Sequence, residues 1–309
     1  MPVSTTDRIV SFIGRKTRFL RPSFLYYGPQ YSPRPVKNTG CPVLLSEKDP
    51  PLISVVIPSY NQGEFLESAI RSILDQHYPR IQMLVVDGGS TDDSVDIIKR
   101  YSSDIDWWCC EPDNGQAHAL NKGFDRSRGE IMAWLNADDA LISGTFSRIA
   151  CYMQERPDVG LVYGHRILID RAGNEIGRWI LPPHDDRVLM WADLIPQETM
   201  FWRRWAWEKA GNRIDDTFRF AMDWDLLLRF RASGAKMVRL PFFMGLFRVH
   251  SGQKTAKMEE LGYEEMDRLR ASVRGYAPAR YRVAMGLAPY LLKARCLELL
   301  CRAGLIKYD

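Results

Sequence analysis

The chain has 309 residues and a formal net charge of +4, and it is 46% hydrophobic and 26% charged, as is typical of a folded soluble protein with one large or two modest domains. Its six cysteines form no CxxC pair and have no zinc-ligand spacing, which argues against a disulfide framework or a zinc site and indicates a reducing compartment. No apolar run approaches the roughly 20 residues that cross a bilayer, and the N-terminus lacks the pattern of a secretory signal. We therefore expect a cytoplasmic protein.

The positive charge lies at the two ends of the chain. Residues 1–40 carry seven Lys or Arg and one Asp, and residues 268–309 carry nine Lys or Arg and two acids, so the region between them has a net charge of −9. Basic ends favour contact with an anionic surface, and an acidic body favours a site that binds a cation. Nucleic acid is not an expected partner, because the sequence has no motif for it and the body is acidic.

Residues 1–50 form a basic N-terminal extension. Apolar and basic residues mix over 6–20 as in an amphipathic helix, and residues 21–42 are rich in Pro, Gly and Tyr, as in a linker or a segment ordered by contact. The body of the protein begins at Pro51.

The first half of the body, residues 51–141, alternates strands and helices. The β-branched run 53–58 predicts a buried strand, and apolar residues then recur at helical spacing over 66–74. Three more strands and two more helices follow, with strands at 83–86, 105–111 and 130–136 and helices at 94–101 and 115–127. This order predicts an α/β fold, with a mostly parallel central sheet flanked by helices.

The second half of the body, residues 142–255, is less regular. The pattern predicts strands at 160–170 and 175–181 around a turn, a helix from about Asp223 to Gly234, and one or two strands that end at His250. Residues 256–309 form a basic C-terminal extension, which we expect to be helical from about Glu259 with breaks near 275–278 and at Pro289.

Polar clusters follow three of the predicted parallel strands. They comprise residues 59–61, Asp87 with 90–92, and Asn136 with Asp138 and Asp139. Ligands of such sheets bind beyond the carboxyl ends of the strands, so we expect the clusters to converge on one crevice. Two adjacent carboxylates suit a hard divalent cation such as Mg²⁺ or Mn²⁺, which would neutralise a diphosphate. Capping of a helix that starts near Ser143 is the alternative role of this acidic pair.

The ordered set IPSYNQGEF, LVVDGGSTDD, EPDNGQAHALNKG and AWLNADD resembles the nucleotide-sugar domain of family 2 glycosyltransferases, which have the GT-A fold. The resemblance is strong over residues 51–141 and continues more weakly to about residue 253. It implies an inverting, metal-assisted transfer of a sugar from a nucleoside-diphosphate-sugar to a hydroxyl of a glycan or lipid-linked glycan, with Mn²⁺ or Mg²⁺ as cofactor. Bacterial surface polysaccharide synthesis at the inner face of the cytoplasmic membrane is the implied setting.

The resemblance implies donor and metal sites on specific residues of this chain. The implied donor-binding residues are Pro58, Ser59, Tyr60, Asn61, Glu64, Asp87, Asn121, Lys122 and Asp138. The implied metal ligands are Asp138 and Asp139, which match the DXD motif, together with His250. Many family members have a second acid directly after the residue that Asp87 matches, and this acid often reads a uracil edge. Gly88 stands there in this chain, so the sequence leaves the nucleotide base open.

A base is also implied at the start of a helix in the second half, because the attacking hydroxyl must lose its proton. The run FAMDWDLLLRF offers Asp223 and, as a reserve, Asp225, although Met222 stands where the family commonly has Glu. The alternative role of both aspartates is to cap and stabilise the start of that helix.

The segment 196–204 resembles the acceptor region of the family. Gln197, Glu198 and Trp202 are implied to meet a sugar there, with core packing as the alternative for Trp202.

The sequence gives weaker support to several alternative functions. A nucleotide-sugar-binding protein without catalysis is supported only by Met222, and an NAD(P)-dependent oxidoreductase or a nucleotidyltransferase would need a glycine-rich loop after the first strand that is absent. A membrane adaptor would explain the basic ends, since 8–21 and 290–308 mix apolar and basic residues as membrane-surface helices do, but it would not explain the strand-end acids. Packing of both ends on the body, with their basic faces in water, is the alternative.

Overall fold

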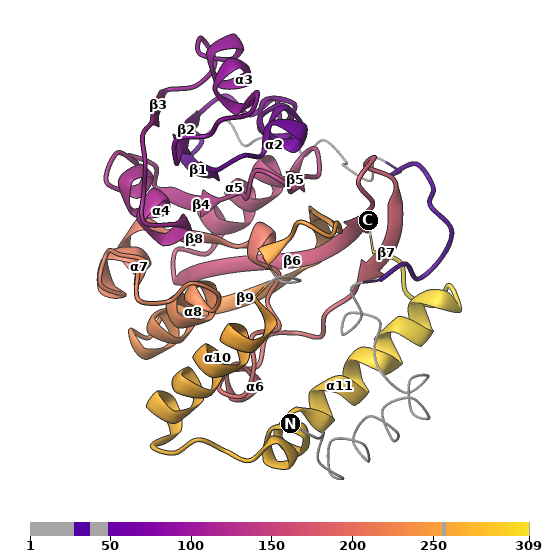
Figure 1. Cartoon of the computed structure of the whole chain (residues 1–309). Coiled ribbons are helices and arrows are strands. Elements are labelled where there is room, and N and C mark those ends of the chain that lie inside the picture. Colours follow the sequence, from indigo (N-terminus) through magenta and orange to yellow (C-terminus); the bar gives the residue numbers. More distant parts are fainter. Residues whose placement is uncertain (1–27, 38–48, 255–257, 309) are drawn as a thin grey trace.

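The computed structural model describes residues 28–37, 49–254 and 258–308 (Figure 1). The first half of the body has the elements β1 (Ile53–Ser59), α2 (Gly63–Leu74), β2 (Ile81–Asp87), α3 (Ser94–Arg100), β3 (Trp107–Cys110), α4 (Gln116–Phe124) and β4 (Ile131–Trp134). β1 pairs in parallel with β2 and β4, and β2 pairs in parallel with β3. The carboxyl ends of these strands therefore meet at one edge of the sheet, which confirms the predicted α/β order.

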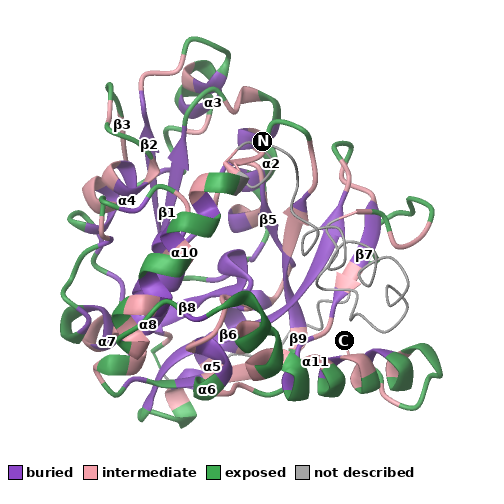
Figure 2. Ribbon diagram, turned by 60° about the horizontal axis from the view of Figure 1, so that its bottom comes forward, coloured by how far each residue is buried: buried purple, intermediate pink, exposed green. Residues whose placement is uncertain are grey.

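Strand β1 is buried along its whole length, because helices cover both faces of the sheet (Figure 2). Val56 joins a core that includes residues of α4, while Val55 and Ile57 join a second core that includes residues of α2. This alternation follows from the two-residue period of a strand. The apolar stripe predicted for α2 is its buried side, with Leu66, Ala69, Ile70 and Ile73 all inaccessible.

The second half of the body continues the same sheet. Its elements are β5 (Ala140–Leu141), α5 (Thr145–Glu155), β6 (Val159–Ile169), β7 (Glu175–Trp179), α6 (Asp186–Leu189), the 3₁₀ turn η3 (Gln197–Thr199), β8 (Phe201–Arg203), α7 (Arg204–Lys209), α8 (Met222–Ala232) and β9 (Lys236–Arg248). Within the described part of the chain, one sheet has the order β3-β2-β1-β4-β8-β6-β9-β5, and β7 pairs with β6.

Strands β8 and β9 connect this half of the sheet to the site edge. β8 is antiparallel to both β4 and β6, so it joins the two halves. β9 runs parallel to β6 and antiparallel to the short β5, which begins directly after Asp139. The end of β9 is thereby held next to the turn that follows β4.

The C-terminal extension is helical, as expected, and forms α10 (Glu259–Arg274) and α11 (Arg280–Arg302). The expected break near 275–278 is confirmed, and Gly275 there has a φ of 76°, which glycine adopts without strain. The break expected at Pro289 is wrong, because α11 continues through it. Pro289 is exposed, so water can reach the carbonyl of Met285 that proline leaves without a helical donor, while buried Tyr290 and Ala294 hold the helix on the body. The helix expected within residues 6–20 lies outside the described residues.

Candidate active site

The carboxylate of Asp87 shapes the turn that follows β2. One oxygen accepts the backbone N–H groups of Gly89, at 3.1 Å, and Ser90, at 2.8 Å, and the other accepts the Ser90 hydroxyl at 2.6 Å. The Cys110 thiol on neighbouring β3 donates to the same carboxylate at 3.2 Å. Asp87 is fully buried, so it orders the loop beside the expected nucleotide rather than presenting a free carboxylate.

The loop after β1 is tied to that turn. Asn61 has a left-handed φ of 50°; its backbone N–H donates to the Ser90 hydroxyl at 2.7 Å, and its side-chain oxygen accepts the N–H of Thr91 at 2.9 Å. Pro58 and Ser59 are buried at the end of β1, whereas the ring of Tyr60 is 62% exposed. Of these four expected donor-binding residues, Tyr60 and Asn61 are thus the exposed ones, and the side-chain oxygen of Asn61 is engaged with Thr91.

The position of the missing second acid is filled from another loop. A Cβ atom built on Gly88 would lie 2.9 Å from a carboxylate oxygen of Asp113 and 3.3 Å from the ring of Tyr60. The other oxygen of Asp113 accepts the N–H of Gly115 at 2.7 Å. A carboxylate therefore lies beside Gly88 although residue 88 has no side chain.

Three other expected donor ligands are occupied by protein partners. Both amide groups of Asn121 bond the backbone of Ile214 at 2.9 Å, and Lys122 pairs with Glu111 at 2.9 Å. Glu64 pairs with the guanidinium of Arg171, and both side chains are largely exposed. Asn121 therefore serves to hold α4 against the chain after α7, while the Glu64 and Lys122 pairs are accessible to solvent.

Asp138 and Asp139 point to different surroundings. Nε2 of His250 lies 3.1 Å from the Asp138 carboxylate, and both side chains are partly exposed. Asp139 is buried, and its oxygens accept the N–H of Arg248 at 3.0 Å and the Asn136 amide at 3.3 Å. Burial, followed by the charge of Asp138, raises the pKa of Asp139 well above its ordinary value.

A buried guanidinium compensates the acidic pair. Arg248 donates to the backbone oxygen of Asp138 at 2.9 Å, and its guanidinium lies 5.0 Å from the ring centre of Phe65 on α2. Because an isolated charge is costly to bury, Arg248 and the two aspartates stabilise one another. The sequence suggested metal binding or helix capping for Asp138 and Asp139, and it did not predict that the guanidinium of Arg248 would lie beside them.

The residues present fit a divalent cation in part. Among the described residues no cluster of three His, Cys, Asp or Glu is arranged to hold a metal. Asp138 and His250 nevertheless offer adjacent, partly exposed groups of the kind that bind metals, whereas both oxygens of Asp139 are engaged. Mg²⁺ in such sites usually takes one or two carboxylates and completes its shell with substrate phosphates and water, so this pair suits a cation carried with a diphosphate.

The predicted base, Asp223, is the second residue of α8, and its side chain is half-buried near another carboxylate, that of Asp193. Burial raises its pKa, while the charges of Lys254 and Arg166 lower it. Asp193, which accepts the N–H of Ile195 at 3.1 Å, is half-buried, and desolvation together with the charge of Asp223 raises its pKa well above the ordinary value. Carboxylates whose pKa values are raised by desolvation and by each other's charge are common where proton transfer takes place.

Lys254 connects this group to the strand-end residues. Its ammonium donates to the Gln116 side chain at 2.9 Å, and Gln116 donates to Asn136 at 2.7 Å. Asn136 in turn donates to Gln197 at 2.9 Å and to Asp139 at 3.3 Å. The end of β4, the start of α4 and the loop after β9 thus share one hydrogen-bonded network.

The reserve base, Asp225, is held in an ion pair. Its carboxylate lies 2.8 Å from the guanidinium of Arg229, one turn further along α8. The alternative of capping is wrong for α8, whose N-cap is Ala221 with no side-chain cap, but both aspartates lie in its first turn, where the helix dipole favours a negative charge.

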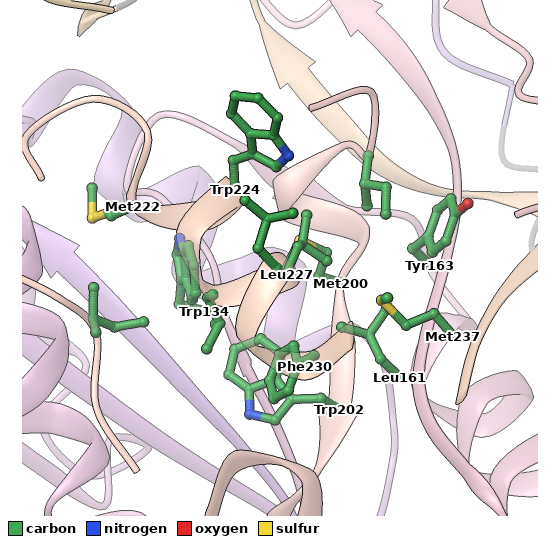
Figure 3. Close-up of a cluster of buried hydrophobic side chains, with 14 of the residues drawn as sticks. Trp134, Leu161, Tyr163, Met200, Trp202, Met222, Trp224, Leu227, Phe230 and Met237 are labelled. Atoms are coloured by element: carbon green, nitrogen blue, oxygen red, sulfur yellow. The ribbon is translucent and has the colours of Figure 1, made fainter. Parts of the chain in front are cut away.

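The acceptor roles implied for Glu198 and Trp202 are contradicted by burial. Glu198 is inaccessible and bonds Arg166 through both carboxylate oxygens. Trp202 is fully buried between Trp134 and Phe230, as Figure 3 shows, with ring centres 5.6 and 5.8 Å away. Gln197 is also buried and donates to the carbonyl of Trp134 at 2.9 Å. These residues support the site from within the core.

Four charged residues of the candidate site were not identified from sequence: Arg166, Asp193, Arg248 and Lys254. Arg248 and Lys254 flank His250 in the run FRVHSGQK, so their proximity to the predicted ligand was a usable signal. Arg166 and Asp193 have no such signal, because only the folded chain brings them near their partners. Arg166 bonds Glu198, 32 positions away, and Asp193 interacts with Asp223, 30 positions away.

Comparison with known proteins places the chain among glycosyltransferases. The model of the family described as "Glycosyl transferase family 2" matches residues 54–233. The putative teichuronic acid biosynthesis glycosyltransferase TuaG of Bacillus subtilis is 32% identical over 136 residues, which are 43% of this chain and 54% of the relative. A PGL/p-HBAD biosynthesis glycosyltransferase of Mycobacterium tuberculosis (strain ATCC 25618 / H37Rv) is 30% identical over 193 residues, which are 61% of this chain and 73% of the relative.

Two solved structures share the fold at low identity. S. aureus TarS 1-349 in complex with UDP-GlcNAc has a TM-score of 0.60 and 16% identity, over 78% of this chain and 71% of that one. The mannosyltransferase PcManGT from Pyrobaculum calidifontis, in complex with GDP-Man and Mn²⁺, has a TM-score of 0.57 and 19% identity, over 96% and 83% of the two chains. The α/β fold expected from sequence is therefore confirmed as that of GT-A glycosyltransferases.

Proposed function

Because this chain belongs to glycosyl transferase family 2, we propose that it transfers one sugar, with inversion, from a nucleoside-diphosphate-sugar to a hydroxyl of a glycan or lipid-linked glycan. The observation that carries the proposal is the hydrogen-bonded network from Lys254 through Gln116 to Asn136 and Asp139, which links the surroundings of Asp223 to the strand end that bears Asp138. A leaving-group site and a proton-accepting site at one edge of a sheet are what a displacement at a sugar carbon requires. The names of the bacterial relatives favour surface glycan synthesis as the setting.

The diphosphate is assigned to the edge where Asp138 and His250 lie together. These two residues would hold Mn²⁺ or Mg²⁺, which when bound supplies positive charge to a diphosphate leaving group. Arg248 keeps the backbone beside Asp138 in place, since its guanidinium donates to the Asp138 carbonyl. Phosphate and cation are thus proposed to share a site that the protein has ordered in advance.

The proton of the acceptor hydroxyl is assigned to Asp223. A carboxylate with a raised pKa is a stronger base than an ordinary one, and desolvation raises the pKa of Asp223. The charge of Asp223 contributes to the raised pKa of the neighbouring Asp193. Lys254 stabilises the ionised form of Asp223 by its charge.

The base of the donor nucleotide is assigned to the surface formed by Tyr60, Gly88 and Asp113. The ring of Tyr60 is accessible for stacking, and Asp113 supplies the carboxylate that residue 88 lacks. TarS and PcManGT are solved with UDP-GlcNAc and GDP-Man respectively, so both nucleotides are candidates for this surface.

The reaction is proposed to take place at the inner face of the cytoplasmic membrane, by peripheral contact. A lipid-linked acceptor has its sugar at that surface, and both chain ends are basic. None of the helices in the described part of the chain is long and apolar enough to cross a bilayer.

The experiment is a thermal-unfolding series with UDP, GDP, dTDP and CDP, each with and without Mn²⁺ or Mg²⁺, followed by turnover of the matching sugar donors. A ligand that binds only the folded chain raises its melting temperature. We expect one nucleotide to give a metal-dependent rise that Asp138→Asn removes and the exposed control Asp158→Asn retains. A rise without turnover of any donor would favour the binding protein without catalysis, and no rise with any pair would contradict the proposed donor site.

A further inference from the structure

The outward face of α11 is apolar. Of the nine large hydrophobic residues that are exposed in the described chain, seven lie between residues 276 and 305: Tyr276, Tyr281, Met285, Leu292, Leu299, Leu300 and Leu305. Single exposed hydrophobics are ordinary on soluble proteins, but a contiguous group marks a surface that is covered in function.

Four of these residues form a stripe along the helix. Tyr281, Met285, Leu292 and Leu299 are spaced by 4, 7 and 7 positions and are 61, 70, 68 and 50% exposed. At 3.6 residues per turn this spacing keeps them on one side. The opposite side is packed on the body, with Tyr290, Ala294 and Glu298 buried. The alternative in which α11 packs on the body with a basic outer face is therefore only half correct, because the outer face is apolar.

Basic residues border the stripe on both sides. Helical spacing places Arg282 and Lys293 along one border and Arg295 and Arg302 along the other. The one acid within α11, Glu298, is buried and pairs with Arg295 at 3.0 Å and Arg302 at 2.5 Å. The helix thus presents an apolar stripe with an excess of positive charge at its borders.

The apolar stripe with basic borders fits one kind of partner. A second copy of α11 would bring its own basic borders against these, and residues 1–27, with five Lys or Arg and one Asp, would also bring positive charge. An anionic lipid surface offers both an acyl layer for the stripe and negative headgroups for the borders. We propose that α11 lies in the plane of an anionic membrane, with the stripe of Tyr281, Met285, Leu292 and Leu299 facing the acyl chains.

This proposal deepens the peripheral membrane contact proposed above by naming the surface that makes it, and its test requires no glycosyl transfer. The full chain is floated with vesicles of phosphatidylcholine alone and of phosphatidylcholine with phosphatidylglycerol. We expect it to float with the anionic vesicles only, and more weakly as salt is raised.

Two variants test the stripe and its border separately. Leu292→Glu with Leu299→Glu should weaken partitioning by roughly tenfold or more, because it places charge in the apolar stripe. Lys293→Glu, a surface change that leaves the packed side intact, should weaken it by roughly fivefold or more. The control Arg187→Glu alters an exposed basic residue outside α11 and should bind like the parent. Circular dichroism and the nucleotide-induced thermal shift verify that each variant is folded and show whether the donor site is intact.

Three results would overturn the proposal. One is flotation with anionic vesicles that both variants retain. Another is a dimer in sedimentation equilibrium that Leu292→Glu with Leu299→Glu dissociates, since the stripe would then bind a second copy. The third is flotation that removal of residues 1–27 abolishes while the α11 variants do not affect it. A nucleotide-induced shift that persists in any of these cases would leave the proposed transferase function standing.

Discussion

The imidazole of His250 lies 3.1 Å from the carboxylate of Asp138, and it joins the end of β9 to the turn after β4 across 112 positions of sequence. The imidazole also packs on Phe65, with ring centres 4.8 Å apart, so α2 fixes its orientation from a third direction. Three separate elements therefore fix the relative position of the two side chains that we propose as metal ligands.

Asp138→Asn should reduce transfer by roughly 100-fold, because the amide keeps the shape but loses the charge that balances a cation and a leaving diphosphate. His250→Gln should weaken the dependence on Mn²⁺ or Mg²⁺ concentration, since it removes the second ligand of the pair. Steady-state rates across a metal titration would measure both effects. Asp158→Asn, which disrupts an exposed pair with Lys236, serves as the control. Unchanged metal dependence in both site variants would rule out this assignment.

Asp223→Asn should lower kcat by roughly 100-fold or more while leaving nucleotide binding in place, because the variant cannot accept the acceptor proton. Asp225→Asn is the matched comparison on the same helix turn. It breaks the 2.8 Å pair with Arg229 and should therefore affect the melting temperature more than the chemical step. Equal losses of kcat in the two variants, at equal stability, would remove Asp223 from its proposed role.

Lys254→Met should shift the acid limb of the pH–rate profile to higher pH. The charge of Lys254 lowers the pKa of Asp223, so removing it raises that pKa further. A base acts only when ionised, and a higher pKa means that ionisation occurs at a higher pH. Profiles of kcat/KM against pH would show the shift, with the exposed Lys236→Met as a control that should not move the limb. A shift toward lower pH would contradict the proposed pairing of Lys254 with Asp223.

Gly88→Asp should destabilise the protein by about 1–3 kcal/mol, because its Cβ would lie 2.9 Å from the Asp113 carboxylate and would add a second negative charge there. Gly88→Asp combined with Asp113→Gly should recover most of this loss, since it moves the carboxylate from one loop to the other. Chemical denaturation of the two variants makes the comparison. If Gly88→Asp alone proves as stable as the parent, the space beside residue 88 is not filled as described.

Trp202→Ala should cost about 3–5 kcal/mol of unfolding free energy, because it empties a fully buried aromatic site between Trp134 and Phe230. Tyr60→Ala changes an exposed ring and should leave stability nearly unchanged while weakening nucleotide binding. Denaturant unfolding and nucleotide titration distinguish the two. A Trp202→Ala protein of parental stability with a higher KM for the acceptor would restore the acceptor role that burial contradicts.

The nucleotide half was predictable because its determinants are local. The apolar run 53–58 and the helical spacing over 66–74 can each be recognised from a few neighbouring residues. The right-handed crossover rule then predicts how consecutive parallel strands pair. The order of the strands beyond β4 was not predictable. The short strand β8 lies between β4 and β6 in the sheet, and no turn signal or hydrophobic period in the sequence indicates this position. The same reason applies to Trp202, whose segment resembles an acceptor region while the sheet encloses its side chain.

The sequence predicted roles for Asp138, His250 and Asp223 but gave no indication of the charged residues that surround them. Motif residues lie at strand or helix ends that the sequence pattern predicts. Arg166 lies in a strand and Asp193 in a loop whose positions in the fold the hydrophobic period does not predict. Arg166 lowers the pKa values of Asp139 and Asp223 by its charge, and Asp223 raises that of Asp193; these interactions depend on folded positions that a sequence does not display.

The pairing of β5 with β9 sets an order of assembly. The parallel core β1–β4 lies within residues 53–134 and can form while the rest of the chain is still being synthesised, whereas the segment that bears Asp138 and Asp139 gains its strand partner only when residues 245–246 arrive. Contacts this distant in sequence form late, because a long loop must close before they yield any stabilisation. A nascent or truncated chain that ends before β9 would thus have the parallel core without the proposed phosphate site, so the proposed nucleotide binding and catalysis should emerge at different chain lengths.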